Sequence, residues 1–103
     1  MLKNLFIGGL VAAGFDSAGE YLLTVSHSGR GVFSTATWER VARDATLAYP
    51  EAGVAVGIGP LDGVSVPVRE IDYDTGQLRF TSPDDKLSFE YESGTLTITE
   101  AAA

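Results

Sequence analysis

Residues 71–98 read IDYDTGQLRFTSPDDKLSFEYESGTLTI, and four short runs within this stretch alternate apolar and polar side chains. Alternation with a period of two is typical of a β-strand that has one face on a core and the other in water. Turn-forming residues separate the runs at 74–76, 82–85 and 92–94. The stretch therefore predicts four consecutive strands joined by tight turns, an antiparallel meander. Its alternating apolar residues are Ile71, Tyr73, Leu78, Phe80, Leu87, Phe89, Tyr91, Leu96 and Ile98.

The first third of the chain has a similar but looser pattern. Residues 5–15, 20–27 and 31–34 are strand candidates, separated by turn-forming residues. Residues 1–13 also resemble a secretory signal, because a lysine near the start precedes an apolar run with small residues. Three glycines interrupt that run, so we favour the strand interpretation and keep the signal as the alternative.

One helix is expected near residues 37–48. Thr37 suits a helix start and Pro50 ends the run. Between them, apolar residues recur at the spacing of one helix face, namely Trp38, Val41, Ala42 and Ala45. Residues 54–58 and 64–68 follow as two further strand candidates, and Pro67 within the second suggests a sheet edge or a bulge.

Together these elements predict an α+β fold. We expect a mostly antiparallel sheet of about seven or eight strands, including the C-terminal meander, with the one helix packed against it. The alternative is an all-β barrel or sandwich, in which residues 38–44 are extended. A chain of 103 residues is the length of one domain, so we expect a single domain over 1–103.

Composition excludes several classes of function. The chain has no cysteine and a single histidine, which excludes thiol catalysis, thiolate metal sites and multi-histidine centres. We therefore predict no metal and no cofactor. Seven basic against fourteen acidic residues give a net charge of −7, a charge that repels nucleic acid and anionic membranes.

The negative charge is unevenly distributed. The first 61 residues carry a net charge of −1, and the residues from Asp62 onward carry −6. Because much of this excess lies in the meander, we expect one sheet face to attract a basic protein partner. The alternative is that the acidic residues serve solubility alone. The candidate partner-binding residues are Asp72, Asp74, Arg79, Glu90 and Glu92.

Residues 26–31, SHSGRG, form a candidate anion-binding turn. Its backbone N–H groups and the side chains of His27, Ser28 and Arg30 could hold an anion. The alternative is a hairpin turn with a solvated arginine. Adjacent serine and histidine residues in one turn cannot normally form a nucleophile–base pair, so we assign no catalytic residue.

These patterns favour a small acidic, non-enzymatic binding protein, such as a bacterial immunity-type inhibitor or an adaptor that holds a basic protein. One alternative is a structural subunit that forms homo-oligomers through sheet edges near Pro67 or residues 5–15. Another is a small enzyme with a cleft near His27 or the pair Glu90 and Glu92. We expect a cytoplasmic location, or secretion if residues 1–13 are a cleaved signal.

Overall fold

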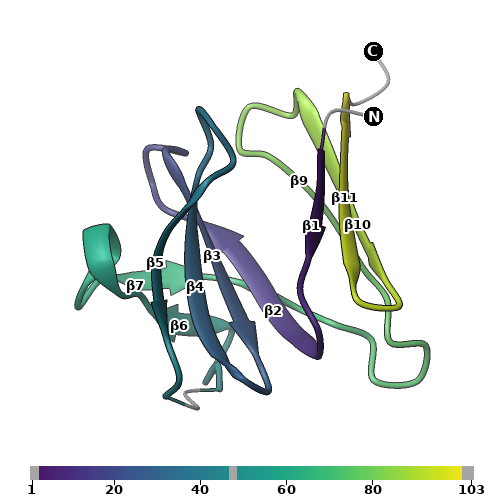
Figure 1. Cartoon of the computed structure of the whole chain (residues 1–103), viewed down its shortest axis with the longest axis horizontal. Helices are drawn as coiled ribbons and strands as arrows, with labels where there is room; N and C mark the ends of the chain where they lie inside the picture. The colour runs from purple at the N-terminus through teal and green to yellow at the C-terminus, as the bar shows by residue number, and fades with distance from the viewer. Residues whose placement is uncertain (1–2, 47–48, 101–103) are drawn as a thin grey trace.

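A computed structural model describes residues 3–46 and 49–100 of the chain. Strand accounts for 58% of it and helix for 3%, so the predicted α+β fold is wrong and the protein is nearly all β. Figure 1 shows the arrangement of the elements. In chain order they are β1 (Lys3–Phe6), β2 (Leu10–Phe15), β3 (Tyr21–Ser26), β4 (Gly29–Ser34), β5 (Arg40–Asp44), β6 (Val54–Val56), the 3₁₀ turn η1 (Gly59–Leu61), β7 (Ser65–Pro67), β8 (Arg69–Glu70), β9 (Leu78–Thr81), β10 (Leu87–Glu92) and β11 (Thr95–Glu100).

The strands form three antiparallel sheets. A four-stranded sheet has the order β1-β11-β10-β9, a five-stranded sheet the order β5-β4-β3-β2-β8, and β6 pairs with β7 in a hairpin. The five-stranded sheet lies in the middle, with the four-stranded sheet on one side and the β6–β7 hairpin on the other (Figure 1).

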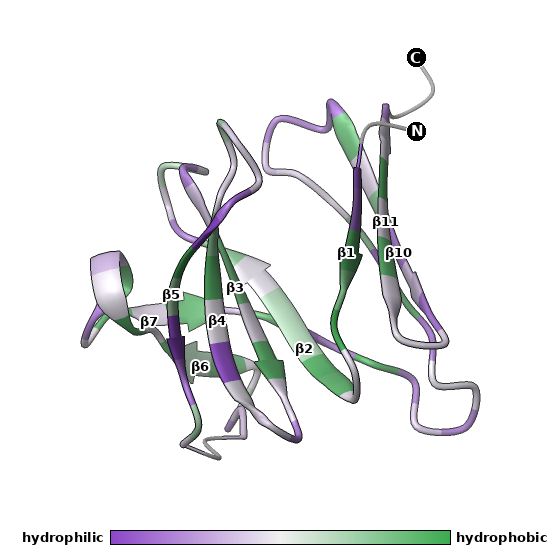
Figure 2. Ribbon diagram, in the orientation of Figure 1, coloured by the Kyte–Doolittle hydropathy of each residue, from purple (hydrophilic) through white to green (hydrophobic). Residues whose placement is uncertain are grey.

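Both faces of the five-stranded sheet are covered at β2, β3 and β4, whereas the edge strand β5 is largely exposed. Neighbouring residues of β3 point to opposite faces of the five-stranded sheet. Leu22 packs toward the four-stranded sheet and Leu23 packs toward the hairpin, and both are fully buried. This explains why β2 and the first half of β3, residues 21–23, are apolar without alternation, and Figure 2 shows the hydropathy of both strands. We call the two clusters the inter-sheet core, which includes Leu22, Phe33, Phe89, Leu96 and Ile98, and the hairpin core, which includes Val11, Leu23, Val32, Leu61 and Val66.

The four-stranded sheet keeps the alternation of the sequence. Phe89 is fully buried in the inter-sheet core, and Glu90 beside it is exposed. Three of the four predicted meander strands are confirmed as β9, β10 and β11, but residues 71–73 do not form the fourth. Ile71 instead donates its N–H to the carbonyl of Val11, and Tyr73 lies in a turn with 70% of its surface exposed. The fourth strand is β1, which pairs with β11 from the other end of the chain.

The predicted helix near residues 37–48 is also wrong where the structure describes it, at residues 37–46. Arg40–Asp44 forms β5, and Trp38 has a φ of 60°, which no right-handed helix admits. Trp38 packs edge-on against Phe89 at 5.7 Å between ring centroids. The register slips within β5, so that Ala42 pairs with Val32, Arg40 pairs with Phe33, and Val41 is an extra, bulged residue. Trp38 packs against the inter-sheet core, Ala42 packs against the hairpin core, and Val41 is 46% exposed, so the helix-like apolar spacing does not mark one face. Residues 47–48 lie outside the described residues.

Residues 5–15, expected as one strand, are divided between β1 and β2 by a turn at Gly8 and Gly9. The hydroxyl of Tyr91 holds this turn, because it donates to the carbonyl of Ile7 at 2.6 Å and accepts from the N–H of Leu10 at 3.2 Å. β2 then passes close beneath the hairpin, where a Cβ at Gly14 would overlap the carbonyl of Pro67.

Candidate functional site

The four-stranded sheet presents one face to solvent, which we call the outer face. It carries the side chains that alternate with the buried ones on β9, β10 and β11. Antiparallel register places Arg79 opposite Glu90, and Glu90 opposite Thr97 on the next strand. The outward residues are Arg79, Thr81, Ser88, Glu90, Glu92, Thr95, Thr97 and Thr99.

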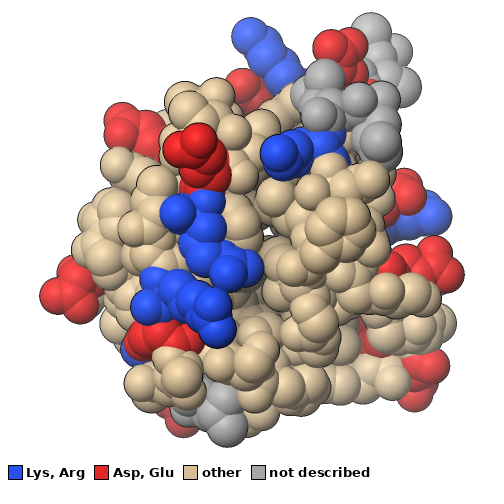
Figure 3. All heavy atoms as spheres, in the orientation of Figure 1, with Lys and Arg blue, Asp and Glu red and all other residues tan. Residues whose placement is uncertain are grey.

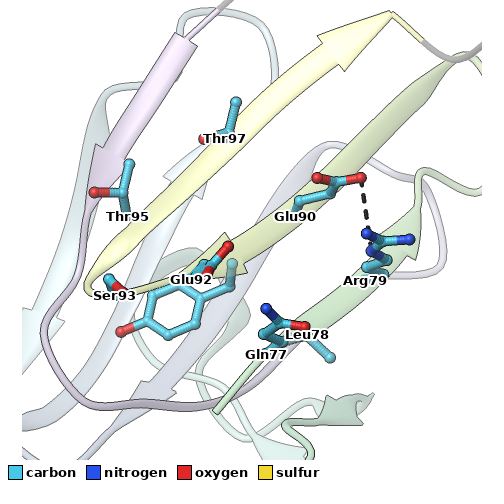
Figure 4. A pocket seen from close by; sticks show the side chains of 9 residues that line it. Gln77, Leu78, Arg79, Glu90, Glu92, Ser93, Thr95 and Thr97 are labelled. Carbon is cyan, nitrogen blue, oxygen red and sulfur yellow. Dashed lines mark ion pairs between the residues drawn. The ribbon is translucent and has the colours of Figure 1, made fainter. Parts of the chain in front are cut away.

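A shallow hollow of about 310 Å³ lies on this face. Figure 4 shows Arg79 and Glu90 along one side of it, with Thr95 and Thr97 on the neighbouring strand. The remaining labelled residues of its lining are Gln77, Leu78, Glu92 and Ser93. The lining is mostly hydroxyl, amide and charged groups, which suits contact with a polar partner more than enclosure of an apolar ligand.

The ion pair on the outer face is weak. Arg79 Nε and Glu90 Oε1 are 3.7 Å apart, and the two side chains are 79% and 59% exposed. An ion pair so open to water contributes about 0–1 kcal/mol, so both groups are available to a partner. Glu92 forms no ion pair with any described residue.

Asp72 and Asp74 lie beside this face rather than on it. They belong to the turn before β9, where the Asp72 carboxylate accepts the N–H of Asp74 at 2.8 Å. Asp72 is bridged to Gln77, and Gln77 precedes the Leu78 that pairs with Tyr91. The turn is therefore attached to the end of the sheet at which Glu92 lies. The structure thus places Arg79, Glu90 and Glu92 in one hollow and the two aspartates at its end.

Other acidic residues of the C-terminal half serve local structure. Asp84 accepts hydrogen bonds from the Ser82 hydroxyl at 2.6 Å and the Lys86 N–H at 3.0 Å. These bonds lower the pKa of Asp84, the Ser82 hydroxyl having the largest effect. Asp84 therefore stabilises the β9–β10 turn.

The candidate anion-binding turn forms the tight connection between β3 and β4. His27 Nδ1 lies 3.0 Å from the hydroxyl of Tyr49, and the Ser28 hydroxyl lies 3.2 Å from that of Ser26. The Arg30 side chain forms its hydrogen bonds with Asp44 and Val56. The side chains of His27, Ser28 and Arg30 therefore do not converge on one position where an anion could bind. Among the described residues, neither serine hydroxyl bonds to His27, and the turn offers no nucleophile–base pair.

Arg30 is held by Asp44 across β4 and β5. Its Nη2 is 2.6 Å from Asp44 Oδ2, its Nε is 3.3 Å from Oδ1, and its Nη1 donates to the carbonyl of Val56 at 3.0 Å. The Arg30 side chain is 13% exposed and that of Asp44 is 30% exposed. The hydrogen bond from Arg30 lowers the pKa of Asp44 below its ordinary value.

Two neighbouring arginines were not predicted as a site. Arg40 and Arg43 line a second hollow, of about 180 Å³, together with residues of β3 and β4. The helix predicted near residues 37–48 would direct both side chains into solvent, so it gave no reason to expect a groove here. The sequence contains one signal for this cluster of positive charge. The acidic chain has only seven basic residues, and three of them, at 30, 40 and 43, fall within fourteen positions.

The sheet edges named for self-association are also visible. Pro67 lies in β7, which among the described strands pairs with β6 alone, and β1 is an edge of the four-stranded sheet with Phe6 77% exposed. No group of three or more potential metal-ligating side chains occurs within residues 3–46 and 49–100. The same residues include no helix of the length and apolarity needed to cross a membrane.

No protein-family model, curated protein or solved structure matches the chain.

Proposed function

We propose that this protein is a non-enzymatic binding protein that holds a basic protein partner on the outer face of its four-stranded sheet. The observation that carries the proposal is the group of exposed carboxylates at one end of that face. Glu90 and Glu92 line the hollow with Arg79, and Asp72 and Asp74 lie in the turn at its end, for a formal charge of −3 over the five residues.

The geometry supports a protein rather than a small ligand. The hollow is shallow and polar, and it lies on an uncovered face of a regular sheet rather than in a closed cavity. A rigid sheet presents its charges at fixed spacing, which favours fast, oriented association with a complementary surface. An inhibitor of a cationic protein or an adaptor for one would use such a face.

The test is an affinity capture of binding proteins at low salt. It uses the full chain in three forms, namely wild type and two charge-reversal variants. Glu90→Lys/Glu92→Lys reverses the outer face, and Glu20→Lys/Glu51→Lys makes the same change in net charge at exposed residues elsewhere. We expect wild type and the Glu20/Glu51 variant to capture the same basic protein, released by rising salt. The outer-face variant should bind it about tenfold more weakly.

The affinity of the identified protein is then measured for all three forms by isothermal titration calorimetry. Equal binding by the outer-face variant would refute the proposal, because the captured protein would then recognise another surface. Equal loss in the two variants would also refute it, because net charge alone would then explain the capture.

A further inference from the structure

The hollow beside β4 and β5, which we call the arginine groove, concentrates positive charge on an acidic protein. Figure 3 shows Lys and Arg side chains gathered over β4 and β5, next to a hollowed part of the surface. The groove is lined by Arg40 and Arg43 on β5, by Thr24, Ser26 and Gly31 on β3 and β4, and by Phe6 across from them.

The bulge in β5 aims both arginines at the groove. Residues three apart on a regular strand point to opposite faces, but Val41 is the extra residue of the bulge. Arg40 therefore pairs with Phe33 and Arg43 pairs with Gly31, and these two residues of β4 share a face. The bulge thus brings two like charges to one face, where neither forms an ion pair with a described residue.

Arg40 is held in place before any ligand binds. Its guanidinium carbon lies 5.2 Å from the centre of the Phe33 ring, a cation–π contact. Arg30 and Asp44 also border the groove, but they neutralise each other in their own ion pair. The groove therefore retains the charge of Arg40 and Arg43, a formal +2.

The floor of the groove is backbone. A Cβ at Gly31 would lie 3.1 Å from the Thr24 hydroxyl and 3.7 Å from Arg40 Nε, so the missing side chain leaves the space beside Arg40. Thr24 and Ser26 donate their hydroxyls to the carbonyls of Gly31 and Gly29 and so fix this floor. The donors left for a ligand are the guanidinium groups.

We infer that the arginine groove binds the phosphate group of a small phosphate monoester. A phosphate monoester carries about −1.5 to −2 charges near neutral pH, which matches the +2 of the groove, whereas a carboxylate supplies one. Guanidinium groups bind phosphate oxygens through paired N–H donors. This site uses different strands from the outer face and does not depend on the function proposed above.

The test is an NMR titration of the ¹⁵N-labelled full chain with inorganic phosphate at constant ionic strength. We expect saturable shifts of the amides of Gly29, Gly31 and Arg43, and no saturable shift with acetate. Arg40→Gln/Arg43→Gln should raise the Kd for phosphate about tenfold for each arginine removed. Gly31→Ala should also raise the Kd for phosphate, because the added methyl group narrows the floor of the groove without changing its charge.

The matched control is Arg69→Gln/Lys86→Gln, which removes two exposed cations elsewhere and should leave the Kd unchanged. An unchanged Kd in the Arg40/Arg43 variant would overturn the inference. So would equal weakening in the control, or acetate binding as tightly as phosphate. The Arg40/Arg43 variant should still capture the basic partner, which separates failure of this site from failure of the outer face.

Discussion

The five-stranded and the four-stranded sheets bury their residues in different ways. The first is covered on both faces at β2, β3 and β4, so Leu22 and Leu23 enter different cores although they are adjacent. The second is covered on one face only, so Phe89 is buried while Glu90 is exposed. The difference lies in what each sheet exposes: β2 and β3 are buried on both faces, whereas the four-stranded sheet leaves one whole face in solvent.

Adjacent substitutions in β3 provide the largest test of this comparison. Leu22→Ala and Leu23→Ala should each lower the free energy of unfolding by about 3 kcal/mol, because each removes a fully buried side chain and leaves a cavity. Urea unfolding of both variants measures the two losses. A loss well under 1 kcal/mol for Leu23→Ala would show that the β6–β7 hairpin does not cover that face in solution.

The same contrast explains which strands the sequence could predict. Apolar and polar side chains alternate along β9, β10 and β11 because one face of this sheet is exposed to water. The sequence pattern therefore indicates to which face each side chain points. β2 and β3 were recognisable as strands from their apolar runs, but burial on both faces removes the alternation that would identify their neighbours. The pairing of β1 with β11 joins the two ends of the chain and leaves no local pattern.

The prediction of β5 failed for a local reason. The apolar residues of this segment recur at helical spacing, but Trp38 and Ala42 pack against different cores and Val41 is 46% exposed. The same error hid the arginine groove, because a helix would direct Arg40 and Arg43 into solvent. On the outer face, alternation was enough to place Glu90 and Glu92 together, since both lie on one regular strand.

The ion pair of Arg30 and Asp44 offers a test of intermediate size, within the five-stranded sheet. The pKa of Asp44 is lowered on folding, so its contribution to stability is present above the ordinary value of 3.8 and is lost as pH falls through the lower folded value. Asp44→Asn should cost about 1 kcal/mol at pH 7, in keeping with a partly buried pair.

Urea unfolding at pH 7 and pH 2.5 checks this. Between these pH values, wild type should lose more stability than Asp44→Asn, by up to about 1 kcal/mol, because the variant has no carboxylate to protonate at this position. Asp84 titrates in both proteins and cancels in the difference. Equal losses in the two proteins would mean that the pair adds nothing to stability.

The smallest expected effect lies on the outer face. Glu90→Ala removes only a 3.7 Å ion pair between exposed side chains, so it should change the free energy of unfolding by less than about 0.5 kcal/mol. Glu92→Ala, which breaks no ion pair with a described residue, is the matched control, and urea unfolding should give similar values for both. A cost above about 1 kcal/mol for Glu90→Ala alone would make the pair structural. Near-neutral values would instead mean that these carboxylates are not required by the fold, so a loss of partner binding on their substitution reports the binding surface itself.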